Sequence, residues 1–129
     1  MRMTIGTLAR QAGVNVETVR YYQRRGLIPE PPRRPRGFRT YDEAALRLLR
    51  FVRRLKGLGF TLVEIAQVLR LRQEGGDAGA ALDALFASKL AQLEGTVRAL
   101  EATARGVRAM RAQVKLVRGE DRWRVLEQD

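Results

Sequence analysis

Arginine carries most of the chemistry that this sequence offers. The chain has 25 basic residues, of which only Lys56, Lys89 and Lys115 are lysines. A guanidinium presents several N–H donors in a planar fork, which matches the oxygens of a phosphate and the O6 and N7 edge of guanine. Residues 1–72 hold 16 Lys/Arg against 5 Asp/Glu, whereas residues 73–129 hold nine of each. This asymmetry predicts that the first part binds a polyanion and that the second part has another task.

Residues that perform catalysis or bind metals are scarce. The chain contains no cysteine and no histidine, and Ser88 is its only serine. The sequence therefore offers no thiolate or imidazole that could select a soft metal ion, and no nucleophile beside a histidine base. Its carboxylates form no pair within an apolar segment. We therefore expect no enzymatic activity, no metal site and no cofactor.

The sequence carries no targeting or membrane signal. The N-terminus lacks an apolar leader, and no apolar run approaches the roughly 20 residues that span a bilayer. We expect a soluble, cytoplasmic protein without a membrane partner. The length fits one domain with an appendage, and the thin core of such a small domain favours support from a partner subunit.

The segments TIGTLARQAG and VNVETVRYYQRRGLI predict a helix-turn-helix. In the first segment apolar residues recur at helical spacing, and Thr4 and Gly13 are suited to begin and end that helix. Asn15 can cap the second helix, and Gly26 can end it. A unit of this kind presents its second helix to the DNA major groove. The face that this helix leaves exposed offers Glu17, Thr18, Arg20, Tyr21 and Arg24.

A loop rich in proline and arginine follows the second helix. Four prolines lie within residues 29–35, and they forbid a helix there. With Gly37 at a turn and Phe38-Arg39-Thr40-Tyr41 after it, the stretch is typical of a small β-ribbon wing. A disordered basic linker is the alternative interpretation.

Two further helices are predicted to support this unit. Asp42 can cap a helix over residues 43–56, and Thr61 with Glu64 forms a capping box that opens the next helix after Gly57 and Gly59. The inward face of the first of these helices is Leu46, Leu49, Val52 and Leu55. The other face of this helix carries Arg47, Arg50 and Arg54. These arginines either form a solvated charged face or contact phosphates.

A single long helix is predicted from about Ala80, after a glycine-rich linker. Apolar residues recur in it with alternating spacings of three and four until Arg111 interrupts the pattern. This pattern is typical of a coiled-coil seam, and a helix packed on its own domain is the alternative. Because the seam is longer than the small N-terminal domain could cover, we predict dimerisation through Phe86, Leu90, Leu93, Val97, Leu100, Ala104, Val107 and Val114.

The fold expected from these segments is mainly α, with a winged helix-turn-helix domain followed by a long dimerisation helix. In the tail, Trp123 and Leu126 lie three residues apart and could dock as one helical turn, with Trp123 as a packing anchor rather than a ligand-stacking group. The predicted boundaries are residues 1–72 for the DNA-binding domain, 73–79 for the linker, 80–118 for the coiled-coil helix and 119–129 for the tail.

The order of these motifs resembles the MerR family of bacterial transcriptional regulators. The resemblance rests on TIGTLARQAGVNVETVRYYQRRGL, GFRTYDEAALRLLRFV and LGFTLVEIAQVL, and it spans over half of the chain. It implies an antiparallel coiled coil in a homodimer that binds double-stranded DNA at a pseudo-palindrome inside an overlong promoter spacer. It further implies that the dimer distorts this DNA so that RNA polymerase can engage both promoter elements.

The resemblance also assigns residues to the DNA interface by motif position. Tyr22 joins the recognition helix, residues around Arg39 form the first wing, and the segment from Lys56 to Thr61 belongs to the second wing. With the exposed face of the second helix, the expected DNA-binding residues are Asn15, Glu17, Thr18, Arg20, Tyr21, Tyr22, Arg24, Arg36, Phe38, Arg39, Tyr41, Lys56 and Thr61.

The effector region departs from the branch of the family that the sequence resembles most, the mercury-responsive one. That branch has cysteines at the start of the coil, at its end and in the tail, where this chain has Gly79, about Val114 and about Trp123. The effector of that branch therefore does not carry over, and the sequence identifies no other. The alternative function is an architectural or excisionase-like recombination-accessory DNA-binding protein, which the long predicted coil disfavours.

Overall fold

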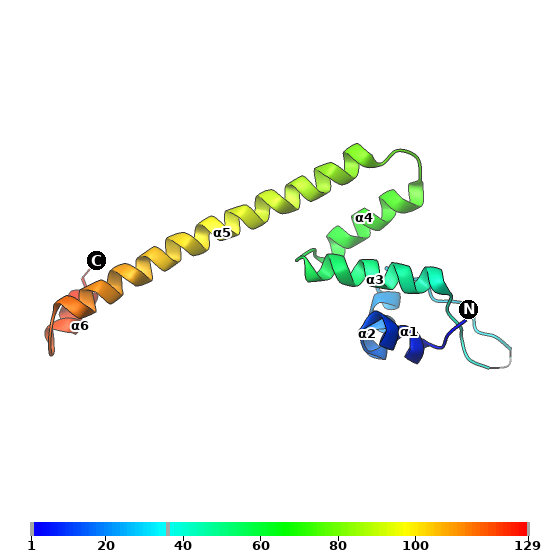
Figure 1. Ribbon diagram of the computed structural model, residues 1–129, viewed down its shortest axis with the longest axis horizontal. Coiled ribbons are helices and arrows are strands. Elements are labelled where there is room, and N and C mark those ends of the chain that lie inside the picture. Colours follow the sequence, from blue (N-terminus) through cyan, green and yellow to red (C-terminus); the bar gives the residue numbers. More distant parts are fainter. Residues whose placement is uncertain (1, 36, 129) are drawn as a thin grey trace. The chain divides into compact units, whose positions relative to one another are not determined.

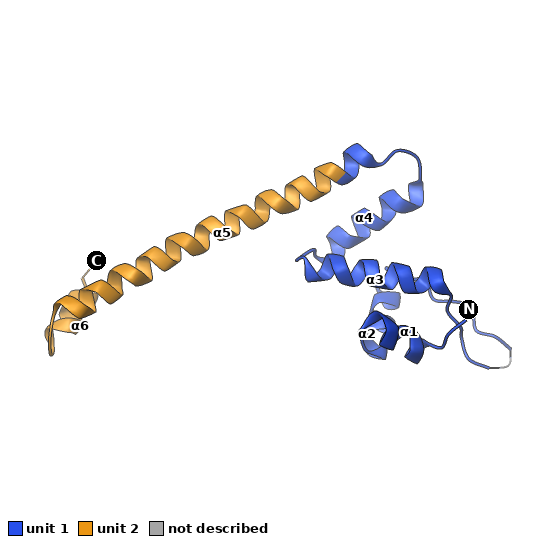
Figure 2. Ribbon diagram, viewed as in Figure 1, with its two compact units in different colours: residues 1–82 blue, residues 83–129 orange. Residues whose placement is uncertain are grey.

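The chain forms two compact units, residues 1–82 and residues 83–129, which Figure 2 shows in different colours. The computed structural model describes residues 2–35 and 37–128. Across these residues it contains six helices (Figure 1): α1 Ile5–Ala12, α2 Val16–Arg24, α3 Glu43–Gly57, α4 Leu62–Glu74, α5 Gly79–Leu116 and α6 Asp121–Leu126.

Each of the first four helices begins at a side chain that accepts a backbone hydrogen bond. Thr4, Asn15 and Asp42 accept from the N–H three residues further on, and so begin α1, α2 and α3. The hydrogen bond that the Ala45 N–H donates to Asp42 holds the pKa of the Asp42 carboxyl below its usual value. Thr61 begins α4 in the same way, and Glu64 Oε1 accepts from the Thr61 N–H to complete the capping box. The helix starts predicted from the sequence are confirmed.

The core of the first unit lies where α1 packs against α2 and α3, and where α3 packs against α4. Gly26 has a left-handed φ of 74°, which turns the chain after α2 so that Leu27 and Ile28 enter this core. The inward face predicted for α3 is confirmed, because all four of its apolar residues are buried. The largest fully buried side chains are Leu8, Val19, Ile28, Leu49, Val52 and Ile65.

The loop between α2 and α3 does not form the β-ribbon that the sequence predicts. No strand occurs among the described residues of this loop; Tyr41 and Met3 instead exchange two backbone hydrogen bonds of 2.8 Å as an isolated antiparallel bridge. The prolines have no N–H, so this loop lacks donors that a regular ladder requires. The wing is therefore an extended loop whose C-terminal end is fixed beside Met3.

The second unit contains most of α5, a helix of 38 residues, and the short helix α6. The helical turn predicted in the tail is present as α6. The sequence predicts that Trp123 is a packing anchor, but in the single chain Trp123 is 67% exposed. Val125 and Leu126 are half-buried instead. None of the helices in the described part of the chain is both long enough and apolar enough to cross a membrane.

Candidate nucleic-acid interface

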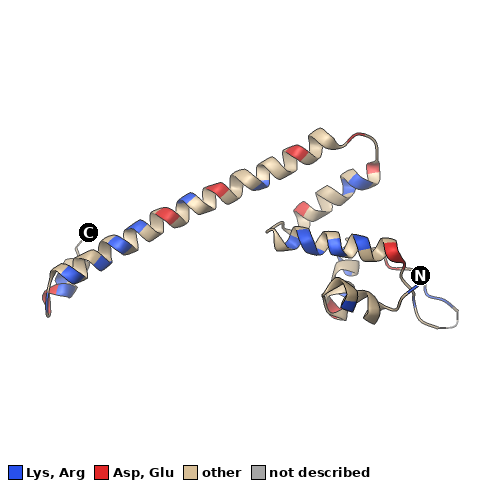
Figure 3. Cartoon of the chain, viewed as in Figure 1, with Lys and Arg blue, Asp and Glu red and all other residues tan. Residues whose placement is uncertain are grey.

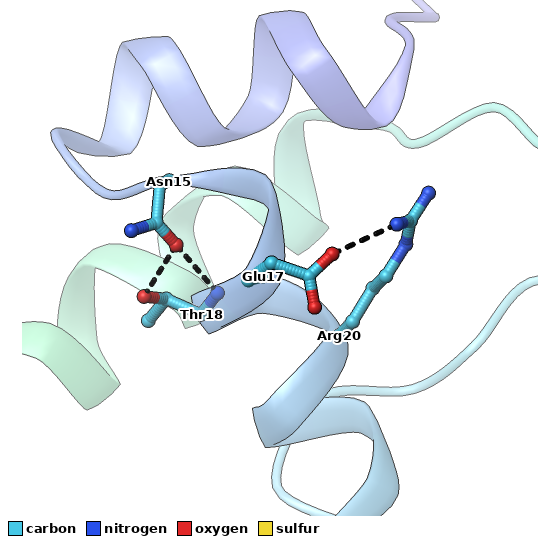
Figure 4. Close-up of polar contacts among 4 residues, drawn as sticks. All are labelled: Asn15, Glu17, Thr18 and Arg20. Atoms are coloured by element: carbon cyan, nitrogen blue, oxygen red, sulfur yellow. Dashed lines mark hydrogen bonds and ion pairs between the residues drawn. The ribbon is translucent and has the colours of Figure 1, made fainter.

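The exposed face of α2 begins with two fixed pairs of side chains (Figure 4). Asn15 Oδ1 accepts hydrogen bonds from the backbone N–H and the hydroxyl of Thr18, each at 2.8 Å. Arg20 Nη1 donates to Glu17 Oε1 at 2.9 Å, and the Arg20 and Glu17 side chains are 54% and 72% exposed. Polar side chains near the start of a recognition helix are those that contact base edges in the major groove. The geometry therefore orders the side chains that such a helix would use.

A second group of predicted residues lies further along α2 and beside it. Tyr21 is 42% exposed, and the guanidinium carbon of Arg24 lies 5.9 Å from the centre of its ring. A hollow of about 510 Å³ joins this face of α2 to Lys56 at the end of α3. Thr61 is exposed at the start of α4. The residues that line the hollow are Asn15, Glu17, Thr18, Tyr21, Tyr22, Arg24, Lys56 and Leu62.

The wing presents arginines and one exposed aromatic side chain. Phe38 is 83% exposed. Arg39 Nη1 forms an ion pair with Glu30 at 2.6 Å, and Arg39 Nε is buried without a hydrogen-bond partner in the part of the chain that the structure describes. A hollow of about 710 Å³ lies where the wing faces α2. Its lining includes Arg20, Gln23, Arg33, Arg34, Phe38 and Arg39.

Two tyrosines predicted to contact DNA are largely buried at the base of the interface. Tyr22 is 7% exposed and Tyr41 is 3% exposed, so most of each ring is buried, although Tyr22 lines the hollow beside Lys56 and Tyr41 lines the hollow beside the wing. The Tyr41 hydroxyl accepts a hydrogen bond of 2.8 Å from Gln23 Nε2, which joins the end of the wing to α2. Both tyrosines thus support the interface from the core, and their contact with DNA stays a prediction. The predicted contact of Arg36 lies outside the described residues.

Two arginines of α3 hold the turn between α1 and α2. Arg50 Nη2 donates to the Gln11 carbonyl at 3.2 Å, and Arg53 Nη1 donates to the Ala12 carbonyl at 3.1 Å. The last carbonyls of a helix lack intrahelical partners and carry partial negative charge, so cations are favourable there. Arg50 remains exposed while it makes this bond, so solvation and phosphate contact both stay open for its other donors. The contact of Arg53 was not predicted from the sequence. Their spacing of three on one helix face was the available signal, but their target depends on how α3 packs against α1.

Gly13→Ala is expected to reduce the free energy of unfolding by about 2–3 kcal/mol, as measured by urea denaturation. Gly13 has φ 73°, which strains a residue with a side chain by about 1–2 kcal/mol. Its added Cβ would also lie 2.6 Å from Arg53 Nη1. The arginine must then leave the Ala12 carbonyl, at a further cost of about 1 kcal/mol for the lost hydrogen bond.

Gly26→Ala is the matched control for this substitution. Gly26 has nearly the same φ, 74°, but nothing lies within 4 Å of a Cβ added there. The free energy of unfolding of Gly26→Ala should therefore fall only by the cost of backbone strain, about 1–2 kcal/mol. Equal losses in the two variants would show that Arg53 does not hold the turn.

Two family models match the chain across this interface and beyond it. The model for the MerR HTH family regulatory protein matches residues 3–71, and the model named MerR, DNA binding matches residues 46–110. The chain belongs to the MerR family. The first MerR match contains α1, α2 and α3 and most of α4, and the second joins most of α3 to most of α5.

Individual MerR relatives match different lengths of the chain. The mercuric resistance operon regulatory protein of Serratia marcescens is 54% identical over 69 residues, which are 54% of this chain and 48% of that protein. The heavy metal-dependent transcription regulator 2 of Rhizobium meliloti is 33% identical over 99 residues, which are 77% of this chain and 67% of that protein. The match thus spans about half the length of the mercuric resistance regulators.

A solved MerR-type structure confirms the predicted fold. The transcription regulator PbrR691 from Ralstonia metallidurans CH34, in complex with lead(II), is similar with a TM-score of 0.77 and 38% identity over 86% of this chain and 87% of that one. The names of these relatives refer to mercury, heavy metals and lead. In this chain, which has no cysteine or histidine, the described residues include no group of three or more His, Cys, Asp or Glu that could hold a metal ion.

Proposed function

We propose that this protein is a transcriptional regulator that acts as a homodimer on a pseudo-palindromic DNA site within a promoter spacer. The observation that carries the proposal is the polar, basic face that α2 and the wing form together. Its side chains are ordered at the start of α2, and arginines surround the hollow beside it. Figure 3 shows that α3 of the first unit also carries basic residues. Such a face suits phosphate contact beside base contact.

We further propose that the chain is divided by task. DNA binding is assigned to residues 1–72, the linker to 73–79, dimerisation to 80–118 and the tail to 119–129. The helices run close to these limits: α4 extends to Glu74, α5 spans Gly79–Leu116 and α6 forms within the tail. The assignment connects one DNA-binding unit to one long helix in each copy.

The seam on α5 supports a homodimer. Six of its eight side chains are large apolar groups between 41% and 63% exposed, and Ala104 and Val114 are half-buried. An exposed apolar stripe with heptad spacing is the surface that a second helix covers in a coiled coil. The six exposed side chains are Phe86, Leu90, Leu93, Val97, Leu100 and Val107.

Charge along α5 favours the antiparallel arrangement (Figure 3). The acidic residues Asp83, Glu94 and Glu101 lie in its first part, whereas every charged residue from 102 to 118 is basic. A parallel dimer would place two basic ends side by side. The antiparallel dimer places each basic end beside the acidic residues of its partner, which lowers the repulsion.

This dimer would act through the shape of the DNA. A rigid coil sets a fixed separation between two recognition helices, and the site must match this separation with inverted half-sites. If the promoter spacer is too long for RNA polymerase, bending and untwisting the bound DNA would align the two promoter elements. RNA polymerase is then the partner that uses the distorted promoter.

Selection of bound fragments from a random DNA library tests the proposal. The expected product is one enriched sequence with two inverted half-sites at a fixed spacing. Enrichment of single half-sites at variable spacing, or none at all, would favour the architectural or recombination-accessory function. Because the selection assumes no known operator, both outcomes are readable.

The protein is expected not to respond to mercury(II), copper(I), zinc or cadmium at sub-micromolar concentration. Tight selection of these ions relies on thiolate or imidazole ligands, and the sequence contains neither cysteine nor histidine. Titration of each metal, followed by the fluorescence of Trp123 and by promoter binding, should give no saturable change, and EDTA should leave promoter binding unaltered. Stoichiometric binding that changes transcription would contradict this expectation.

A further inference from the structure

Acidic residues have few and specific places in the basic first unit. Of the five in residues 1–72, Asp42 and Glu64 cap helices and Glu43 lies in the first turn of α3. These three are stabilised by the partial positive charge at a helix start. The remaining two, Glu17 on α2 and Glu30 at the base of the wing, each form an ion pair with an arginine. The carboxylate of Glu17 lies on the face that would approach DNA, where it repels the phosphates and so weakens DNA binding. We therefore expect from Glu17 a contribution to DNA recognition that offsets this repulsion.

Stability does not account for the Glu17–Arg20 pair. Glu17 also lies in the first turn of α2, where its charge is favourable, but that effect requires no arginine partner. The two side chains are 72% and 54% exposed, and ion pairs with this exposure contribute little to folding. The pair does orient the guanidinium, because Arg20 Nη1 lies 2.9 Å from Glu17 Oε1, and this contact favours one direction of a long, otherwise flexible side chain. Figure 4 shows the two side chains reaching toward each other along the exposed face of α2.

A guanidinium oriented in this way suits one kind of base contact. Arg20 uses Nη1 to bind Glu17 Oε1, which leaves the edge formed by its other nitrogens to donate two hydrogen bonds in parallel. In the major groove, the O6 and N7 atoms of guanine accept such a pair of bonds. A donor that is already oriented recognises one position more sharply, because less conformational freedom is lost when it binds.

We propose that Glu17 is a positioning residue for Arg20, and that the two act as one unit that recognises a guanine in each half-site of the DNA. This inference rests on the proposed function, since it requires α2 to enter the major groove. The inference extends the proposed function in two ways. It names the base that is recognised, and it makes the Glu17 carboxylate necessary for the choice of that base. In the absence of Glu17, Arg20 would still bind DNA but would turn toward phosphates, which carry no sequence information.

The test is a double-mutant cycle on DNA in which each base pair of one half-site is replaced in turn. Wild type, Glu17→Gln, Arg20→Ala and the double variant are compared on the sequence that the wild-type protein selects. Arg20→Ala is expected to lower the preference for G·C at one base pair by about 10–100-fold. Glu17→Gln should lose most of the preference at that same base pair while binding unrelated DNA a few-fold more tightly. The double variant should be no less selective than Arg20→Ala alone.

A control variant separates this coupling from a simple change of net charge. Glu43→Gln removes the same charge from the first turn of α3, and it should leave the preference at every base pair unchanged. Circular dichroism establishes that each variant is folded. If Glu17→Gln changes affinity for all sequences alike, or if Glu17 and Arg20 act additively at different base pairs, the coupling is refuted while the regulator function stands. If wild-type protein selects no sequence at all, both proposals fail.

Discussion

Leu93→Asp is expected to convert the homodimer into a monomer and to abolish measurable binding to DNA with two half-sites. Leu93 lies on the α5 seam with its side chain 42% exposed in the single chain. In the proposed dimer it is covered by the partner helix, and an unpaired carboxylate buried there costs on the order of several kcal/mol in each copy. A monomer binds through one half-site alone, which forfeits the gain from linking two sites. Light scattering measures the mass, and a gel-shift assay measures the DNA binding.

Ala102→Asp is the matched control for this prediction. It introduces the same charge on the same helix, but Ala102 lies opposite the seam, where a heptad position faces solvent. This variant should remain dimeric and should bind DNA nearly as the wild-type protein does. A Leu93→Asp protein that is still dimeric at micromolar concentration would show that the seam does not form the dimer.

Raising the salt concentration from 50 to 200 mM is expected to weaken DNA binding by about 10³–10⁵-fold, if the dimer neutralises roughly 6–10 phosphates. Each neutralised phosphate releases a counterion, and this release becomes less favourable as salt rises. The exposed arginines around the wing are placed to make such contacts. Equilibrium binding at several salt concentrations gives the slope, and a slope near zero would contradict a phosphate-binding face.

Arg34→Ala tests whether the wing arginines cause this dependence of DNA affinity on salt. Arg34 is an exposed wing residue, and a homodimer loses two copies of it, so the slope of log affinity against log salt should become shallower by about two. Binding should weaken equally for all sequences, because a phosphate contact does not distinguish bases. Arg98→Ala on α5 removes the same charge far along the chain and should leave the slope unaltered.

The helices of the first unit could be predicted because their signals are local. Thr4, Asn15, Asp42 and Thr61 each accept from an N–H only three residues away, so the sequence alone contains both partners. Local periodicity also indicates that the ring of Tyr22 is buried. Tyr22 follows the buried Val19 by three residues and therefore shares its inward face.

The rest of the candidate site depends on contacts between distant residues. Tyr41 is buried because its backbone pairs with Met3 and its hydroxyl with Gln23, and neither pairing has a sequence signal. The ion pair between Arg39 and Glu30 likewise depends on the path of the wing, which its prolines keep extended but do not direct. The sequence thus predicted which residue types reach the surface of α2 better than it predicted how the wing is attached.

Footprinting on the promoter that contains the selected sequence tests the central claim most directly. The account predicts one continuous protected stretch in the spacer between the two promoter elements, with two inverted half-sites that are protected together at the same protein concentration. Transcription from that promoter in a purified system should change at this same concentration. Scattered or sequence-independent protection, with no change in transcription, would contradict the account.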